Sequence, residues 1–378
     1  MRIIRLSRSI VGQAEAEAVS RVIIEDGYLG MGREVQLFEK EIAEFLGVPI
    51  EWVICVNSGT AALHLAVEAV TAPGDEVLSQ SLTYLATFQA ISAAGAIPIA
   101  CEIFPQNVTI NLQDAEKRYT SSTKIVMPVH YASNPGDLDS IYDFARKYGL
   151  RVIEDAAHAF GCTYKGRKIG SFGDIVCFSF DGIKNITSGE GGAVVTADQE
   201  VAQYVRNARL LGVEKDTEKR YSGQRSWEFD VHNQGYRYHM SNIMAAIGRV
   251  QLKRFAGEFA PRRQALARKY REILDKCVGI RFFDTDLNAI VPHIQPIRVL
   301  NAKRDALRAF LEERNIGTGI HYKPNHLLSY YGYGRVSLPV TEKLYEELLT
   351  LPLHPGISDG DVEYVCESVK EFLHNSYR

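Results

Sequence analysis

Short apolar runs alternate with longer amphipathic segments along the first two-thirds of the chain. The apolar runs are typical of buried β-strands and lie at residues 53–56, 76–78, 97–103, 124–129, 150–154, 175–180 and 193–196. Helical spacing of apolar residues follows several of them, at residues 58–69, 87–94, 137–148 and 199–211. Strands that alternate with helices predict an α/β fold with a mostly parallel sheet sandwiched by helices.

The last third of the chain has a different pattern. Residues 240–274 are mostly helical, with a break near Ala260 and Pro261. The elements expected after them are strands at 293–299 and 317–322 and helices at 303–314, 341–350 and 359–373. This pattern predicts a smaller C-terminal α+β domain. We therefore expect a large domain over residues 1–250 and a small domain over residues 251–378.

Composition narrows the class of protein. Hydrophobic residues make up 46% and charged residues 24% of the 378, which are ordinary values for a globular chain. The net charge of −3 offers no basic excess to neutralise a phosphate backbone, so we expect no nucleic-acid partner. No apolar run approaches the roughly 20 residues of a membrane span, and no secretory signal is visible. The six cysteines are scattered without a C-x-x-C pair, so we expect no metal site and a cytoplasmic protein without a membrane partner.

A candidate anion site follows the first predicted strand. The segment NSGTAA (57–62) connects that strand to a helix. Free backbone N–H groups and the positive end of the helix dipole attract an anion there, and Ser58 and Thr60 add two hydroxyl donors. The same residues also suit an ordinary helix cap with a turn glycine. Alone, the segment therefore leaves both interpretations open.

Two further polar groups follow later strands. Asp155 ends an apolar strand, where a buried carboxylate needs a partner such as a protonated ring nitrogen, although it could also cap the next turn. Lys184 follows the next strand and precedes the glycine-rich turn TSGEGG (187–192). A surface lysine is the default interpretation. A lysine at a strand end can instead project into a ligand crevice, where desolvation lowers its pKa and leaves a nucleophilic amine.

Together these features match the contacts that pyridoxal phosphate requires. The anion site would hold the phosphate, Asp155 would keep the pyridine nitrogen protonated, and Lys184 would bind the aldehyde. Tyr84 lies between a predicted strand and a predicted helix, and it can supply an aromatic face for the ring. We therefore predict pyridoxal 5'-phosphate as the cofactor.

The same motifs resemble those of a known family. NSGTAALHLA (57–66), EDAAHAFG (154–161), GSFGDIVCFSF (170–180) and KNITSGEGG (184–192) occur in the order and at the spacing typical of DegT/StrS-type nucleotide-sugar aminotransferases. The resemblance begins at GYLGMG (27–32) and continues to LPLHP (351–355), so it covers nearly the whole chain. It implies fold type I, the fold of aspartate aminotransferase, and dependence on pyridoxal phosphate.

The resemblance also implies roles for individual residues. Lys184 corresponds to the Schiff-base lysine, Asp155 to the partner of the pyridine nitrogen and Tyr84 to the ring-stacking residue. The residues that match phosphate contacts are Ser58, Gly59, Thr60 and Ser179. His158 corresponds to a residue beside the cofactor ring. The residues of the segment that corresponds to a substrate-side loop are His321, Tyr322 and His326.

One position departs from the family pattern. In similar proteins the site lies at the interface of a homodimer, and a Gly-Tyr-Asn-Tyr-Arg-Met stretch of the partner subunit adds a phosphate ligand. Here the stretch reads GYRYHM (235–240), with Arg237 in place of the asparagine. A guanidinium can bind the cofactor phosphate or a substrate anion. Arg237 is therefore a cofactor-binding candidate whose role stays open.

The activity implied by the resemblance is amino transfer between two small molecules. An amino acid, expected to be L-glutamate, gives its amino group to a keto-deoxysugar nucleotide, with C4 favoured over C3 of the sugar. The product would be an amino-sugar nucleotide for polysaccharide or O-antigen biosynthesis. Some similar proteins have histidine at the lysine position and act as dehydratases, so Lys184 favours transamination. The alternatives are another fold type I enzyme, such as a lyase or desulfurase, and a non-catalytic regulator.

Overall fold

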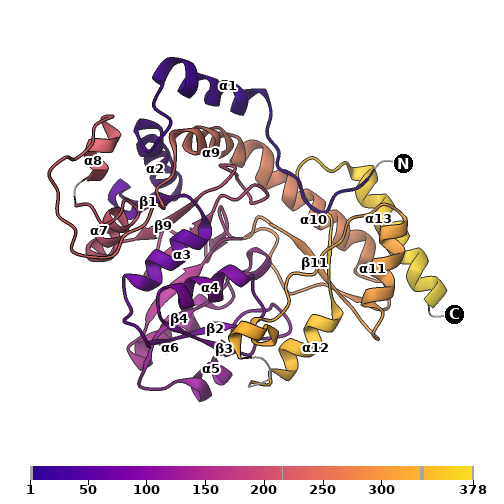
Figure 1. Cartoon of the computed structure of the whole chain (residues 1–378). Helices are drawn as coiled ribbons and strands as arrows, with labels where there is room; N and C mark the ends of the chain where they lie inside the picture. Colours follow the sequence, from indigo (N-terminus) through magenta and orange to yellow (C-terminus); the bar gives the residue numbers. More distant parts are fainter. Residues whose placement is uncertain (1–2, 215, 333–335, 377–378) are drawn as a thin grey trace.

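The centre of the molecule is a seven-stranded sheet (Figure 1), seen in a computed structural model that describes residues 3–214, 216–332 and 336–376. Its strands are β1 (Val53–Val56), β2 (Glu76–Gln80), β3 (Ile97–Cys101), β4 (Thr123–Met127), β5 (Arg151–Asp155), β8 (Ile175–Ser179) and β9 (Gly192–Thr196). Their order is β1-β9-β8-β5-β4-β2-β3. β9 is antiparallel to both of its neighbours, whereas the pairs from β8 to β3 are parallel. The predicted α/β class with a mostly parallel sheet is confirmed.

Helices cover both faces of this sheet. Because side chains alternate along a strand, Val53 and Cys55 of β1 enter one core and Ile54 and Val56 enter the other. The helices on the first face are α2 (Arg33–Leu46), α5 (Leu112–Arg118), α6 (Leu138–Tyr148) and α9 (Asn242–Arg254). Those on the second face are α3 (Gly59–Glu68), α4 (Leu85–Ala93) and α7 (Gln199–Ala208). Burial on both faces explains why the strands are continuous apolar runs.

A second, three-stranded sheet is built from the C-terminal third. It has the order β10 (Ile280–Arg281), β11 (Gln295–Val299) and β12 (Leu348–Leu351), with antiparallel pairing. The helices around it are α10 (Ala260–Leu274), α11 (Arg304–Glu313) and α13 (Asp359–Ser376), which lie together at one side of the molecule in Figure 1. Ile4 joins this core and pairs with Ile316. The N-terminal segment therefore contacts the C-terminal part, while the domain boundary near residue 250 stays a prediction.

Two expected elements of this part were wrong. Residues 348–350 were expected to end the helix at 341–350, but α12 (Pro339–Glu347) stops before them and they belong to β12 (Leu348–Leu351). All four residues of β12 are buried and pair with β11, so tertiary pairing outweighs the local helical spacing. Residues 317–322 were expected to form a strand, but they make only an isolated bridge from Gly319 to Thr350. After this bridge, His321 and Tyr322 turn into a cavity instead of continuing along β12.

The remaining helices and strands are short. Those of the first half are α1 (Gln13–Arg21), η1 (Val22–Asp26), η2 (Ile50–Trp52), η3 (Tyr131–Ser133), β6 (Thr163–Tyr164) and β7 (Arg167–Lys168). Those of the second half are α8 (Asp216–Tyr221), η4 (Phe255–Phe259), η5 (Asn325–Leu327) and η6 (Ser329–Tyr331). The π-helical turn η4 occupies the place of the expected break before Pro261 and joins α9 to α10. Within the described parts of the chain, no helix combines the length and the apolar character needed to cross a membrane.

Candidate active site

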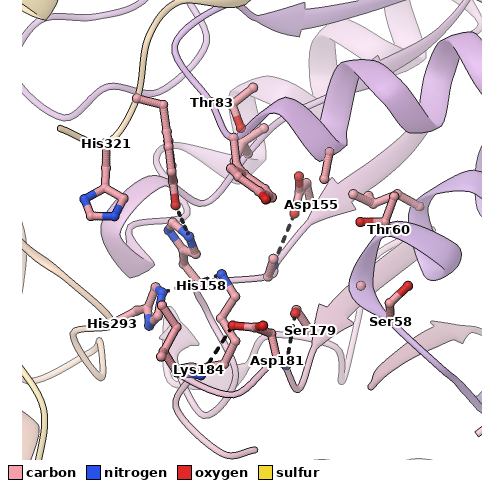
Figure 2. A pocket seen from close by; sticks show the side chains of 18 of the residues that line it. Ser58, Thr60, Thr83, Asp155, His158, Ser179, Asp181, Lys184, His293 and His321 are labelled. Atoms are coloured by element: carbon pink, nitrogen blue, oxygen red, sulfur yellow. Dashed lines mark hydrogen bonds between the residues drawn. The ribbon is translucent and has the colours of Figure 1, made fainter. Parts of the chain in front are cut away.

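A cavity of about 450 Å³ opens beyond the carboxyl ends of β5 and β8. In Figure 2, Ser58 and Thr60 lie on one side of this cavity and His293 and His321 on the other. The predicted site residues that line it are Ser58, Gly59, Thr60, Tyr84, Asp155, His158, Ser179, Lys184, His321 and Tyr322. The fold therefore gathers side chains that are up to 264 residues apart (322 − 58) around one space.

The first turn of α3 forms one wall of the cavity. Ser58 caps this helix, since its Oγ accepts the Ala61 N–H at 3.0 Å. A β-carbon on Gly59 would lie 2.7 Å from the β-carbon of Ser179, so only glycine lets this turn contact the end of β8. The first N–H groups of a helix have no carbonyl partner within the helix. This wall can therefore bind an anion with backbone N–H groups and the nearby hydroxyls.

Asp155 ends β5 and is only 4% exposed. Its Oδ2 accepts the Thr87 hydroxyl at 2.7 Å, and its Oδ1 accepts the Ala157 N–H at 3.2 Å. Burial raises the pKa of the Asp155 carboxyl, while the hydrogen bond from Thr87 acts in the opposite direction. A buried carboxylate without a full counter-charge is suited to hold a protonated ring nitrogen.

Lys184 projects into the cavity from the turn after β8. Its backbone N–H donates to the Asp181 carbonyl at 3.1 Å, which closes this turn. Burial lowers the pKa of the Lys184 amine to about 8, although Asp181 and Asp155 act in the opposite direction. A minor fraction of the amine is therefore neutral near physiological pH, much more than for an exposed lysine, and the neutral form is the one that a nucleophile requires.

Three histidines surround the amine. The rings of His158 and His293 lie 4.4 Å apart between centroids, and the Tyr322 hydroxyl lies 3.1 Å from Nε2 of His158. Burial lowers the pKa of His158 and of His293 well below the usual range, and lowers the pKa of His321 to about 4. These rings are therefore neutral at physiological pH. The positive charge on this side of the cavity is then that of Lys184 in its protonated form.

Two tyrosines whose rings lie close together line the cavity. The ring of Tyr84 is 57% exposed and lies 5.4 Å from the ring of Tyr322. Tyr84 directly precedes α4 and lines the cavity. An exposed aromatic ring at this position can cover a planar ligand.

Two predicted site residues lie outside the cavity. His326 is 1% exposed, and its ring contacts Ser81 Oγ at 2.7 Å and Glu342 Oε1 at 3.2 Å, so it anchors the segment around η5. Arg237 is exposed on the surface, and its carbonyl accepts the Asn57 side-chain amide at 3.2 Å. Their roles toward a ligand stay predictions.

Sequence reasoning missed several residues of the site. Asp181 and Glu190 also line the cavity, and both lie in turns next to Lys184, where a closer reading of the turns would have found them. Thr87 contacts Asp155 from α4, and His293 reaches Lys184 from the segment before β11. No local motif marks Thr87 or His293, because only the folded chain brings them to their partners.

Known proteins are similar to this chain in sequence or in structure over nearly its whole length. The spore coat polysaccharide biosynthesis protein SpsC of Bacillus subtilis is 38% identical, over 97% of this chain and 96% of that protein. The crystal structure of the aminotransferase TlmJ from Streptoalloteichus hindustanus covers 100% of both chains, with 34% identity and a TM-score of 0.92. The PLP form of the putative sugar aminotransferase Spr1654 from Streptococcus pneumoniae covers 99% of both chains, with 28% identity and a TM-score of 0.89. A PMP form of Spr1654 is similar to the same extent, with a TM-score of 0.90.

The fold, the cavity and these similarities define an aminotransferase that depends on pyridoxal phosphate. Residues 10–370 match the sequence model of the DegT/DnrJ/EryC1/StrS aminotransferase family, and the chain belongs to this family. The resemblance stated from the motifs and the predicted cofactor are thereby confirmed.

The residues of the cavity fit this cofactor. The first turn of α3, where a β-carbon on Gly59 would meet Ser179, offers backbone N–H groups to the phosphate. The buried Asp155 carboxylate suits the pyridine nitrogen, and the Lys184 amine suits the aldehyde. These three groups come from separate elements and face the same cavity, as one ligand with three distinct ends requires.

Proposed function

We propose that this protein transfers the amino group of L-glutamate to the keto group of a nucleotide-linked deoxysugar. The observation that carries the proposal is the cavity itself, where the amine of Lys184, the carboxylate of Asp155 and the first turn of α3 meet. The sugar as acceptor is supported by the similar proteins, since one is named for polysaccharide biosynthesis and another is a putative sugar aminotransferase.

The chain's own groups have distinct tasks in this reaction. Pyridoxal phosphate, when bound, supplies an electron sink for the negative charge that develops at the substrate carbon. Asp155 holds the positive charge of the pyridine nitrogen, which deepens this sink. Lys184 Nζ accepts the proton from the substrate carbon and returns it, a role that typically contributes about 10²–10⁴-fold. Tyr84, an exposed aromatic side chain of the cavity lining, would cover the ring of the bound cofactor.

The product we propose is an amino-sugar nucleotide for polysaccharide or O-antigen biosynthesis. We favour a 4-keto over a 3-keto sugar as the acceptor. The cytoplasm is the compartment we propose, because all six cysteines are free thiols.

The cavity gives no support to a desulfurase. That chemistry needs a reactive cysteine thiolate that can reach the substrate. None of the six cysteines lines the cavity in the described parts of the chain. Burial raises the pKa of the Cys162 thiol to about 12, so this thiol stays protonated.

We further propose a homodimer in which Arg237 serves the cavity of the partner subunit. Arg237 is exposed and does not line the cavity of its own chain, so it is free to extend toward the cavity of a second copy. Large exposed apolar side chains also occur nearby in the sequence, at Trp227, Phe229 and Val231. Exposed apolar surface of this kind is typical of a subunit interface.

The test is a two-step assay with purified holoenzyme. L-Glutamate alone should convert the bound cofactor to its amine form, which changes the absorption spectrum, and D-glutamate is the matched control. A panel of 4-keto and 3-keto sugars linked to dTDP, UDP or GDP should then yield an amino sugar, identified by mass spectrometry. A protein that accepts amino groups from no amino acid, or passes them to no keto-sugar nucleotide, would contradict the proposal.

A further inference from the structure

Lys184 contacts a histidine that comes from a distant part of the chain. Nε2 of His293 lies 3.5 Å from Nζ of Lys184. The backbone of His293 is fixed on both sides, since its N–H donates to Ser133 Oγ at 3.0 Å and its carbonyl accepts Arg263 Nη1 at 3.2 Å. The ring also packs against His158. His293 is therefore held in place toward the amine by groups other than the amine itself.

The second ring nitrogen of His293 has no hydrogen-bond partner among residues 3–214, 216–332 and 336–376. His293 is 4% exposed, so Nδ1 is also removed from solvent. A buried N–H without an acceptor is rare in proteins, whereas a buried acceptor without a donor is better tolerated. The neutral ring therefore carries its proton on Nε2, which is the nitrogen that faces Lys184.

Charges around the ring exclude the imidazolium form. Burial and the positive charges of Lys184 and Arg263 all lower the pKa of His293. Arg263 is 2% exposed, and its guanidinium bonds only to backbone carbonyls, among them those of Lys184 and Ile183, so no carboxylate offsets its charge in the described chain. With a proton on Nε2 and no positive charge, the ring can only donate to Lys184.

We propose that His293 is a positioning residue for Lys184, whose Nε2–H donates to the lone pair of Nζ and favours the neutral amine over the ammonium. This role rests on the proposed function, in which Lys184 is the reacting amine. A hydrogen bond to the neutral form of a group favours that form. The ammonium has no lone pair to accept Nε2–H, so protonation of Lys184 breaks the contact and the proton is returned more readily.

Other charged groups also face Lys184 and must be separated from this effect. Asp181 on the same turn and Asp155 on β5 favour the ammonium, whereas Arg263 on α10 disfavours it. His158 and His321 are neutral and contribute little charge. Substitutions at position 293 leave these charged groups in place, and a variant that restores a donor separates the contact from a change in the burial of Lys184.

The test measures the pKa of Lys184 in cofactor-free protein, from the pH dependence of acetylation at position 184 followed by peptide mass spectrometry. His293→Leu removes the donor and should raise this pKa by roughly 0.5 to 1, as the loss of one hydrogen bond implies. His293→Gln keeps a donor at similar reach and should restore a value close to that of the natural protein. His354→Leu, which changes another buried histidine outside the cavity, should leave it unchanged. An unchanged or lower pKa in His293→Leu would overturn the proposal.

A second measurement does not depend on a folded variant. In ¹⁵N-histidine-labelled, cofactor-free natural protein, the His293 ring should show the neutral Nε2–H tautomer by NMR. An Nδ1–H tautomer or an imidazolium would overturn the proposal. Borohydride reduction of the holoenzyme tests Lys184 separately. If position 184 were unlabelled while the tautomer and the pKa behaved as expected, the contact would stand and the proposed function would fail.

Discussion

Gly59 in the first turn of α3 lies directly against Ser179 at the end of β8. A β-carbon on Gly59 would be 2.7 Å from the β-carbon and 3.0 Å from the hydroxyl oxygen of Ser179. Gly59 belongs to a helix and Ser179 to a strand of the seven-stranded sheet. Their contact therefore fixes the position of the N-terminus of α3 relative to the sheet. The first turn of α3, which we call the anion wall of the cavity, therefore depends on the absence of a side chain at position 59.

Gly59→Ala should weaken the binding of pyridoxal phosphate. The added methyl group forces α3 and β8 apart, at a cost of roughly 1–3 kcal/mol for an overpacked contact. We expect a clear rise in the dissociation constant, measured by spectroscopic titration of cofactor-free protein with pyridoxal phosphate. Gly360→Ala in α13 is the matched control, because a β-carbon there meets nothing within 4 Å. Equal cofactor affinity in both variants would argue against the anion wall at α3.

Asp155→Asn should lower kcat by about 10²–10³-fold, as the loss of a preorganised charge at the reacting group implies.

Thr87→Val should lower kcat less than Asp155→Asn and should also change the pH dependence of kcat. It removes the 2.7 Å hydrogen bond to Asp155, which favours the ionised carboxylate, so the pKa of Asp155 should rise further. The acid limb of the kcat profile should then move to higher pH.

The control for this pH signature is Thr71→Val, which changes a threonine whose hydroxyl donates to Val67 at the end of α3, away from the cavity. Its pH profile should coincide with that of the natural protein. An acid limb that does not move in Thr87→Val would show that Thr87 does not influence the charge state of Asp155.

The sequence alone was enough to predict those residues of the site that have polar or reactive side chains and lie at the ends of strands. Asp155 ends β5, Ser179 ends β8 and Lys184 lies in the turn after β8, and the carboxyl ends of parallel strands meet at one edge of a sheet. His293 could not be predicted in this way, because it reaches the cavity from the C-terminal third and is held there by Ser133 and Arg263. No periodicity or spacing in the sequence encodes such a contact.

The small sheet shows the same limit for the fold. Residues 341–350 have helical spacing, yet the helix ends at Glu347 because the next residues complete the hydrogen bonds of β11. A local pattern cannot reveal that a distant strand lacks a partner. In the large sheet, by contrast, β1, β2, β3, β4 and β9 are each followed by a helix, and this alternation along the sequence is enough to predict the layers.

Mixing of two inactive variants should test whether the site is shared between subunits. If Arg237 of one subunit serves the cavity of the other, a dimer of Lys184→Ala with Arg237→Ala contains one complete site. Random assortment after unfolding and refolding of an equal mixture should then restore about a quarter of the sites. The measurement is aminotransferase activity of the mixture against each variant refolded alone. A mixture that stays as inactive as its components would place Arg237 outside the partner's site.

Lys184→Met should stabilise the cofactor-free protein at neutral pH, because the natural residue buries a charge at a cost. The pKa of Lys184 is about 8 in the folded chain, against 10.5 for an exposed lysine. Between these two values the unfolded chain binds a proton that the folded chain does not, so the stability of the natural protein rises with pH across this window. The advantage of methionine should therefore be on the order of 2–3 kcal/mol below pH 8 and should shrink toward pH 10.5. Urea unfolding at pH 7 and pH 10 measures this difference, with the exposed Lys124→Met as the control. A stability difference that is constant with pH would show that the amine at position 184 titrates as it does in water, and that the cavity does not prepare it for reaction.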